Sequence, residues 1–182
     1  LYGLAAIILS LLCLAVLFII IVGNGYPAFQ QTYVQLKIFF DPAVLGQENL
    51  SSADFPGLVK GTLRSMFPDV TGRSDKRALY KLVSPGAAFQ LREMILEDPG
   101  LVGKTVSVWV PADDDVDMLV KGHIDRNVSE SGRRLSNKQL AWVDELSRQG
   151  KIEKRFNKIF FTAGDSREPE LAGIGGAASG TI

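Results

Sequence analysis

The longest apolar stretch of the chain constrains it more than any other feature. Leu4–Val22 reads LAAIILSLLCLAVLFIIIV, with Ser10 and Cys13 as its mildly polar members, and the first charged residue is Lys37. At about 1.5 Å rise per residue, a helix of this length covers roughly the 30 Å hydrocarbon thickness of a bilayer. A helix also satisfies its own backbone polar groups in hydrocarbon. The stretch therefore predicts a transmembrane helix, with the rest of the chain attached to one side of a membrane.

Two other interpretations of this stretch are weaker. A buried core helix normally shows a polar face, and this run has none. A secretory signal peptide has a shorter apolar region and a small-residue cleavage site, and no such site precedes Tyr26–Pro27. The positive-inside rule needs basic residues on the flanks, and Leu1–Gly3 carries no charge, so the residues alone predict no orientation.

Composition excludes several classes of function. The 182 residues contain 20 Lys and Arg against 20 Asp and Glu, so no overall basic field favours a nucleic-acid partner. Cys13 is the single cysteine and His123 the single histidine, which excludes a disulfide framework, a catalytic thiol outside the apolar run and a Cys/His zinc site. We expect no cofactor and no metal.

Aromatic residues flank the apolar stretch. Tyr2 precedes it, and Tyr26, Phe29 and Tyr33 follow it. Such rings favour the headgroup level of a bilayer, so they indicate an interfacial belt. Gly23–Pro27 is expected to end the helix, because glycine allows a left-handed cap and proline cannot continue the hydrogen-bond ladder.

Three segments have the pattern of strands. Tyr33–Phe40 alternates apolar and polar residues, Thr105–Val110 is rich in β-branched and aromatic residues, and Ile152–Thr162 ends in an apolar group. The polar residues from Asp41 through Ser52 are expected to form a loop.

Short amphipathic helices are predicted between these strands. Asp54 is expected to cap one that Pro68 closes, Ser74 to cap the next, and Ser84 to cap a third with Pro85 at its first position. A short helix is expected after Pro111–Asp113, as far as about Lys121. Ser136 and Gln139 form a capping box for the last helix, which ends at Gly150.

These elements predict an α+β fold. We expect a transmembrane anchor at residues 1–25 and a single extracytoplasmic domain of short helices and a small sheet at 26–168. Residues 169–182 are expected to be either the start of a second membrane helix or a flexible glycine-rich tail. Leu171–Ile182 is uncharged and too short to span a bilayer, and its small residues recur at a spacing that lets membrane helices approach closely.

The densest acidic cluster is Asp113–Asp117. A calcium loop needs glycine at its sixth position and glutamate at its twelfth, but counting from Asp113 these positions hold Met118 and Ile124. Carboxylates also cap the free amides of a helix N-terminus and suit its dipole. We interpret the cluster as such a start.

Other polar groups also lack a catalytic pattern. His123 follows Gly122 at an expected helix end, and its pairing with Asp125 in catalysis would need a nucleophile that the sequence does not provide. Gly164–Glu170 departs from the nucleophile elbow because position 168 is Glu; it is interpreted as a capped helix entry, with a partner contact as the alternative.

The remaining charged stretches suggest a solvated surface. Arg133–Arg134 and Lys151–Lys158 are interleaved with acids, and no phosphate-binding loop is present. Asn49 and Asn127 begin glycosylation sequons, which matter only in a eukaryotic secretory setting. The sequence therefore predicts no catalytic, cofactor-binding or metal-binding residue, and we do not expect an enzyme.

Several longer stretches carry a family resemblance. They are LYGLAAI at the start, IVGNGYPAF, RALYKLVSPGAAFQLREMILEDPGLVG, VWVPADDDVDMLVKGHID, LSNKQLAWVDEL and, most specifically, RFNKIFFTAGDSREPELAGI. Together they resemble the N-terminal region of the phosphate ABC-transporter permease subunit PstA, in its long alphaproteobacterial form. The resemblance runs from Leu1 to Ile174.

The resemblance implies a topology and a set of partners. It places the N-terminus in the cytoplasm of a bacterium, one helix in the inner membrane, and the region from about Tyr26 to Glu170 in the periplasm as a non-catalytic insertion. It implies a role in assembly or in contact with the periplasmic phosphate-binding protein, with an ABC ATPase and the lipid bilayer as further partners. It also gives the small-residue tail a meaning, as the first turns of a second membrane helix.

The permease core does not lie within these residues. A permease has further spans and a cytoplasmic segment that docks on its ATPase, and no position here matches a phosphate-contacting residue. The alternative prediction is therefore a single-span accessory subunit, packed against a larger respiratory or photosynthetic membrane complex. Co-purification distinguishes these two predictions.

Overall fold

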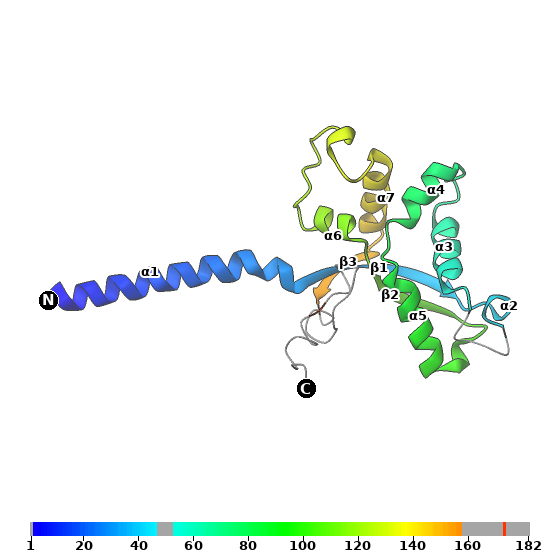
Figure 1. Cartoon of the computed structure of the whole chain (residues 1–182), viewed down its shortest axis with the longest axis horizontal. Helices are drawn as coiled ribbons and strands as arrows, with labels where there is room; N and C mark the ends of the chain where they lie inside the picture. The colour runs from blue at the N-terminus through cyan, green and yellow to red at the C-terminus, as the bar shows by residue number, and fades with distance from the viewer. Residues whose placement is uncertain (1, 47–52, 158–172, 174–182) are drawn as a thin grey trace. The chain divides into compact units, whose positions relative to one another are not determined.

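The fold is α+β, as the sequence predicts. The computed structural model of the protein describes residues 2–46, 53–157 and 173. Two compact units divide the chain, Leu1–Gln30 and Gln31–Ile182, while the predicted limits 1–25, 26–168 and 169–182 stay a prediction. Figure 1 shows the elements, which in chain order are α1 (Tyr2–Gly25), η1 (Tyr26–Phe29), β1 (Gln30–Phe39), α2 (Pro42–Leu45), α3 (Phe55–Met66), α4 (Arg73–Tyr80), α5 (Gly86–Glu97), η3 (Pro99–Leu101), β2 (Thr105–Pro111), α6 (Asp114–Val120), η4 (Glu130–Gly132), α7 (Asn137–Arg148) and β3 (Ile152–Phe156).

The first unit is built on α1. Its segment Gly3–Gly25 has a mean hydropathy of 3.3, and none of the apolar window is buried within the protein. Its large side chains are exposed, as at Phe18 and Ile19, which a core helix would not show. The helix is thus long and apolar enough to cross a membrane. It ends at Gly25, and Pro27 lies in the first turn of η1.

The second unit contains a three-stranded sheet in the order β2-β1-β3. The strands β1 and β2 are antiparallel, in a register from Tyr33 opposite Pro111 to Phe39 opposite Thr105. Both of the first two predicted strands are confirmed. The third is confirmed over Ile152–Phe156, and its predicted continuation to Thr162 lies outside the described residues.

The alternation of β1 decides which face of the sheet is buried. Val34, Leu36, Ile38 and Phe40 are all fully buried, while Lys37 on the other face is exposed. The helices supply the rest of one hydrophobic core. Its fully inaccessible members from the helices include Leu63 of α3, Leu79 of α4, Leu91 and Ile95 of α5, Val116 of α6 and Leu146 of α7.

The outer edge of β2 is covered by the chain that leads into α5. The N–H of Ser84 donates to the carbonyl of Pro111 at 3.0 Å, and the side-chain amide of Gln90 donates to the carbonyl of Trp109 at 3.0 Å. These two bonds satisfy carbonyl groups at the C-terminal end of β2 from its outer side.

The predicted caps of two helices are confirmed. The Asp54 carboxylate accepts the N–H of Gly57 at 2.8 Å at the start of α3. Ser136 and Gln139 form the capping box of α7. After α7, Gly150 has a φ of +67°, the left-handed conformation that glycine adopts without strain.

Two local predictions are wrong. Ser74 does not cap α4: the helix begins at Arg73, and the carbonyl of Gly72 accepts the N–H of Lys76, since glycine is also a tolerated cap. The predicted loop from Asp41 through Ser52 begins with a helical turn, α2, because Asp41 caps Ala43 and Pro42 is preset for helix. Residues 47–52 of that prediction lie outside the described residues.

The start of α5 differs by one position from its prediction. Pro85 is the cap residue rather than the first helical residue, and Gly86 begins the helix. The predicted role of Ser84 survives in part, because its hydroxyl accepts the N–H of Gly86 at 2.9 Å.

Candidate functional site

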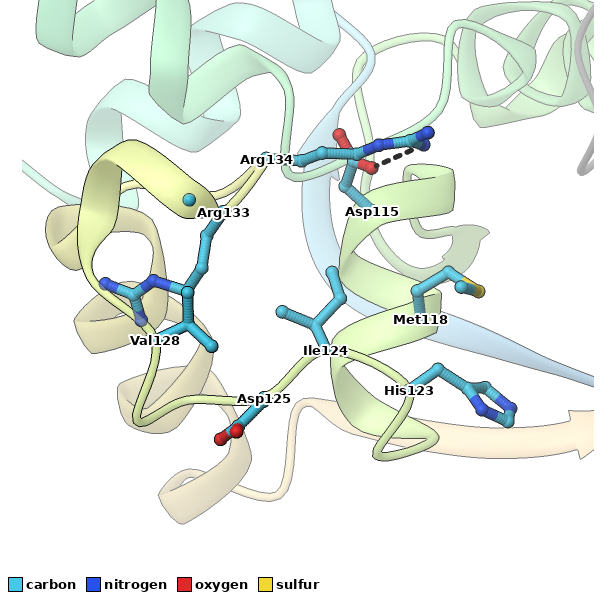
Figure 2. Close-up of a pocket in the computed structure, with 9 residues that line it drawn as sticks. Asp115, Met118, His123, Ile124, Asp125, Val128, Arg133 and Arg134 are labelled. Atoms are coloured by element: carbon cyan, nitrogen blue, oxygen red, sulfur yellow. Dashed lines mark hydrogen bonds and ion pairs between the residues drawn. The ribbon is translucent and has the colours of Figure 1, made fainter.

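A cavity of about 340 Å³ lies between α6 and the loop that follows it (Figure 2). It contains the single histidine of the chain and much of the charge that the sequence singled out. Its lining residues are Asp115, Met118, His123, Ile124, Asp125, Val128, Gly132, Arg133 and Arg134.

The acidic cluster of α6 serves the helix itself. Asp113 caps α6 by accepting the N–H of Asp115 at 3.2 Å. Asp117 accepts the N–H of Thr32 at 2.8 Å and forms an ion pair with Lys121 at 2.5 Å. The cluster is thus a helix start, as predicted, and Asp117 additionally fixes α6 to the beginning of β1.

His123 lies just beyond the C-terminus of α6, as predicted. Gly122 has a φ of +82°, and the N–H of His123 donates to the carbonyl of Met118 at 2.9 Å. In Figure 2 the imidazole points away from Asp125, so the structure does not bring together the pair considered from the sequence. The carboxylate of Asp125 instead accepts the N–H of Asn127 at 2.8 Å.

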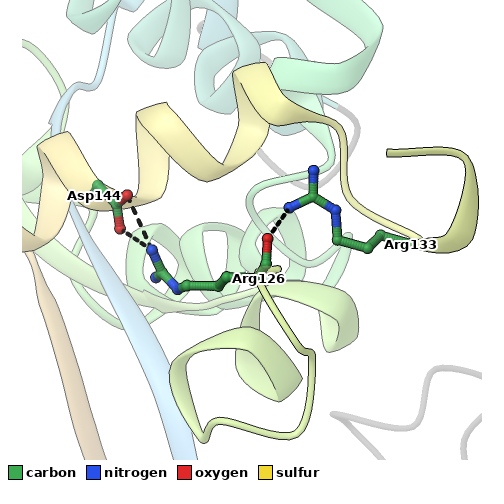
Figure 3. A network of polar contacts seen from close by, with 3 residues as sticks. All are labelled: Arg126, Arg133 and Asp144. Atoms are coloured by element: carbon green, nitrogen blue, oxygen red, sulfur yellow. Dashed lines mark hydrogen bonds and ion pairs between the residues drawn. The ribbon is translucent and has the colours of Figure 1, made fainter. Parts of the chain in front are cut away.

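The loop that closes the cavity is tied to α7 by arginines (Figure 3). Arg126 contacts both oxygens of Asp144, at 2.8 and 3.0 Å, and Arg133 donates to the carbonyl of Arg126 at 3.3 Å. Arg133 also bonds the side chain of Asn137, although its buried Nε has no partner among the described residues. Arg134 reaches Asp115 at 3.4 Å. This arrangement holds a loop in place by paired charges.

The chemistry available in the cavity is charge pairing and contact. Its lining contains no serine, threonine, cysteine or lysine that would act as a nucleophile. Over the described residues, no three His, Cys, Asp or Glu side chains gather in a way that would hold a metal ion. The cavity therefore presents mainly charged and apolar side chains, several of which are already paired.

The comparisons with known proteins give one match. Residues 1–130 match the family described as domain of unknown function DUF3333, which covers most of the 182 residues. The chain belongs to the DUF3333 family. Neither a curated protein nor a solved structure matches it. The DUF3333 match runs from α1 to Glu130, so the arginines Arg133 and Arg134 lie beyond it.

A second cluster in this DUF3333 protein lies on the sheet face opposite the core. The Arg155 guanidinium lies 4.4 Å from the Trp109 ring centroid and 5.9 Å from that of Tyr33. The same guanidinium donates to the carboxylate of Glu153 at 2.8 Å. The sequence predicts a solvated face for Lys151–Lys158; Glu153 and Lys154 are indeed exposed, while Arg155 is half-buried against the two rings. The strand alternation would have put 153 and 155 on one face, but only the pairing of β3 with β1 brings them to Trp109.

Tyr33 was predicted to belong to an interfacial belt, and its ring lies on this same sheet face. Burial raises the pKa of the Tyr33 hydroxyl above its usual value, and the nearby charge of Arg155 partly lowers it. The ring is thus held in a partly dry site by the sheet and the arginine.

Other residues considered from the sequence are not brought into either cluster. Asn127 is exposed in the loop after α6. Gly164–Glu170, Asn49 and most of Leu171–Ile182, with Gly173 as the exception, lie outside the described residues.

Proposed function

We propose that this DUF3333 protein is the anchor and periplasmic domain of a phosphate ABC-transporter permease of the PstA type. In this proposal α1 holds the chain in the bacterial inner membrane, and the α+β unit stands on the periplasmic side. The domain is non-catalytic, and it serves assembly or contact with the phosphate-binding protein.

The observation that supports the proposal is the change, directly after α1, from an exposed apolar helix to a folded unit. A helix of mean hydropathy 3.3 with no buried apolar window is joined through η1 to a unit with its own fully buried core. Such a helix gains stability from lipid and not from packing within this chain. A single span carrying a folded domain fits the N-terminal region that the sequence resembles.

The non-catalytic role is supported by the cavity beside α6. Its carboxylate at Asp115 is paired with Arg134, and the one at Asp125 is bonded to a backbone amide. Groups held in this way bind or position a loop.

The test is co-purification of the natural full-length protein from its own membranes in mild detergent. We expect the ABC ATPase and the phosphate-binding protein to be enriched with it, and phosphate uptake to fall when the segment 31–157 is deleted. Recovery with a respiratory or photosynthetic complex in place of the transporter proteins would contradict the proposal and favour the accessory-subunit alternative.

The periplasmic orientation has a separate test. In a Cys13→Ser background, Ser107→Cys places one thiol at an exposed position on β2. We expect a membrane-impermeant maleimide to label it in intact spheroplasts. Labelling that appears only after lysis would place the domain in the cytoplasm. Cys13→Ser alone is the matched control, because its labelling reports background.

A further inference from the structure

The outer side of α4 concentrates positive charge in a chain whose net charge is zero. Arg73, Arg77 and Lys81 are all exposed and follow one another at intervals of four residues, so they lie one above the other along the helix. Within the part of the chain that the structure describes, none of the three forms an ion pair. We call Arg73, Arg77, Lys81 and the neighbouring Arg134 the basic α4 surface.

The acidic groups near this surface are already engaged. Asp75 pairs with Lys138 at 2.7 Å, and Asp115 pairs with Arg134 at 3.4 Å. Asp113 accepts a backbone N–H as the cap of α6. Neither Arg77 nor Lys81 forms an ion pair with a carboxylate among the described residues.

A cavity of about 280 Å³ opens between these cations. Arg77, Lys81 and Arg134 line it together with Asp113 and Asp115. Its remaining wall is well ordered by packing: Leu135 and Gln139 are almost fully buried, and the Gln139 amide donates to the Ala78 carbonyl at 3.1 Å. The cations thus stand around a fixed hollow that is large enough to take a carboxylate side chain.

The three cations repel one another, although Arg77 and Lys81 also suit the negative end of the α4 dipole. Like charges four residues apart repel each other, and Arg73, Arg77 and Lys81 form two such neighbouring pairs without an intervening acid on that side. A repulsive arrangement beside a hollow is explained if an external negative charge offsets it.

We propose that the basic α4 surface docks the acidic face of a water-soluble partner protein, with a carboxylate of the partner entering the cavity beside Arg77, Lys81 and Arg134. Charge complementarity is the argument for this occupant. The proposal holds whichever membrane complex α1 belongs to, so it does not rest on the proposed transporter function.

A protein partner fits better than anionic lipid. Segments that hold anionic lipid are clusters of basic residues directly beside a membrane helix. Here Tyr26–Leu36, which follows α1, carries no charge at all. The free cations lie instead on a helix of the second unit and surround a shaped hollow.

The first test measures binding of a fluorescent poly-L-glutamate peptide to the full chain in nanodiscs of neutral phosphatidylcholine. We expect the triple variant Arg73→Glu, Arg77→Glu, Lys81→Glu to bind about tenfold more weakly, and high salt to weaken the wild type similarly. The control variant Lys37→Glu, Arg92→Glu, Lys104→Glu makes the same charge change at three other exposed positions and should bind within about twofold of wild type. Equal effects of the two variants would overturn the proposal.

A second measurement does not depend on the variants. A carbodiimide couples a carboxylate of the bound peptide to a lysine amine at zero length, and mass spectrometry then locates the linkage. We expect Lys81 to be coupled most strongly, whereas coupling spread evenly over the exposed lysines would overturn the proposal. The reversal breaks no ion pair among the described residues, so the triple variant should keep a cooperative melting transition.

Two further experiments test whether anionic lipid or free phosphate binds the basic α4 surface instead. Binding to phosphatidylglycerol vesicles that depends on the basic α4 surface and exceeds binding of the glutamate peptide would assign the surface to lipid. Displacement of the peptide by equimolar inorganic phosphate would assign the cavity to a free ion. Either result would overturn docking of a protein face.

Discussion

At the scale of single residues, Arg155 links two aromatic rings on the sheet face opposite the core. Its guanidinium stands over Trp109 and near Tyr33 while it pairs with Glu153. Cation–π contacts of this kind contribute about 0.5–1 kcal/mol at exposed sites. The cluster joins β2, β1 and β3 across one face, so it supports the sheet where no core residue does.

Tyr33 makes this cluster sensitive to alkaline pH. Its pKa in the folded protein is raised above the value near 10 of an unfolded chain, chiefly by burial. The neutral hydroxyl therefore contributes stability that is fully present below pH 10 and is lost as the pH rises through the higher folded pKa. We expect Tyr33→Phe to remove this loss.

The measurement is the melting temperature of the full chain in detergent at pH 9 and pH 11. The wild type should lose more stability over this interval than Tyr33→Phe does. Tyr26→Phe is the matched control, because it removes a hydroxyl from an exposed ring. Equal losses in wild type and Tyr33→Phe would show that the Tyr33 hydroxyl does not carry the effect.

At the scale of secondary-structure elements, β1 separates a core face from an open face by alternation. Leu36 is fully buried, whereas its neighbour Lys37 is exposed on the opposite face. We expect Leu36→Ala to cost about 2–5 kcal/mol of unfolding free energy, because it leaves a cavity in a packed core. Lys37→Ala should change stability by less than about 0.5 kcal/mol. Chemical unfolding measures both, and a similar cost for the two would contradict the assigned register.

The capping box of α7 gives a second test at this scale. The Ser136 hydroxyl accepts the N–H of Gln139 at 3.3 Å, and the Gln139 side chain accepts the N–H of Ser136 at 3.0 Å. We expect Ser136→Ala to destabilise the second unit by about 1 kcal/mol. Ser147→Ala, on the exposed side of the same helix, should be neutral or slightly stabilising. Chemical unfolding would count against the capping role if the two variants were equally stable.

Elements whose signals are local were predictable from the sequence. The alternation of Tyr33–Phe40 and the capping box at Ser136 each lie within a few residues, and both are confirmed. The cap of α4 and the turn α2 were missed because aspartate, serine and glycine all favour both caps and turns. Local chemistry there permits two structures, and packing selects one.

The clusters that define the candidate sites were not predictable in the same way. Arg155 stacks on Trp109, and Lys138 pairs with Asp75, across long separations in sequence. Periodicity in the sequence does not predict such pairs, because they follow from the strand order and from the way α7 packs beside α4. The sequence shows which residue types are present, but it does not predict which of them become neighbours in the fold.

At the scale of the whole molecule, the chain combines two units that require different surroundings. The second unit buries a hydrophobic core of its own, formed by its sheet and helices. The first unit exposes nearly every large side chain of α1. Exposed apolar area on this scale is unfavourable in water by roughly 25 cal/mol per Å², which an apolar environment around α1 removes. The exposed apolar surface of α1 therefore requires an apolar environment, either lipid or another protein.

A charge placed in the middle of α1 tests whether that medium is the bilayer. Leu12 is exposed and lies near the centre of the apolar segment Gly3–Gly25. Arginine at the centre of a membrane helix costs about 2.5–3.5 kcal/mol of insertion free energy, whereas isoleucine is as favourable there as leucine. We expect alkaline carbonate to extract a substantial fraction of Leu12→Arg from membranes, and to leave wild type and Leu12→Ile in the pellet. If all three proteins were extracted equally, α1 would not act as a membrane anchor.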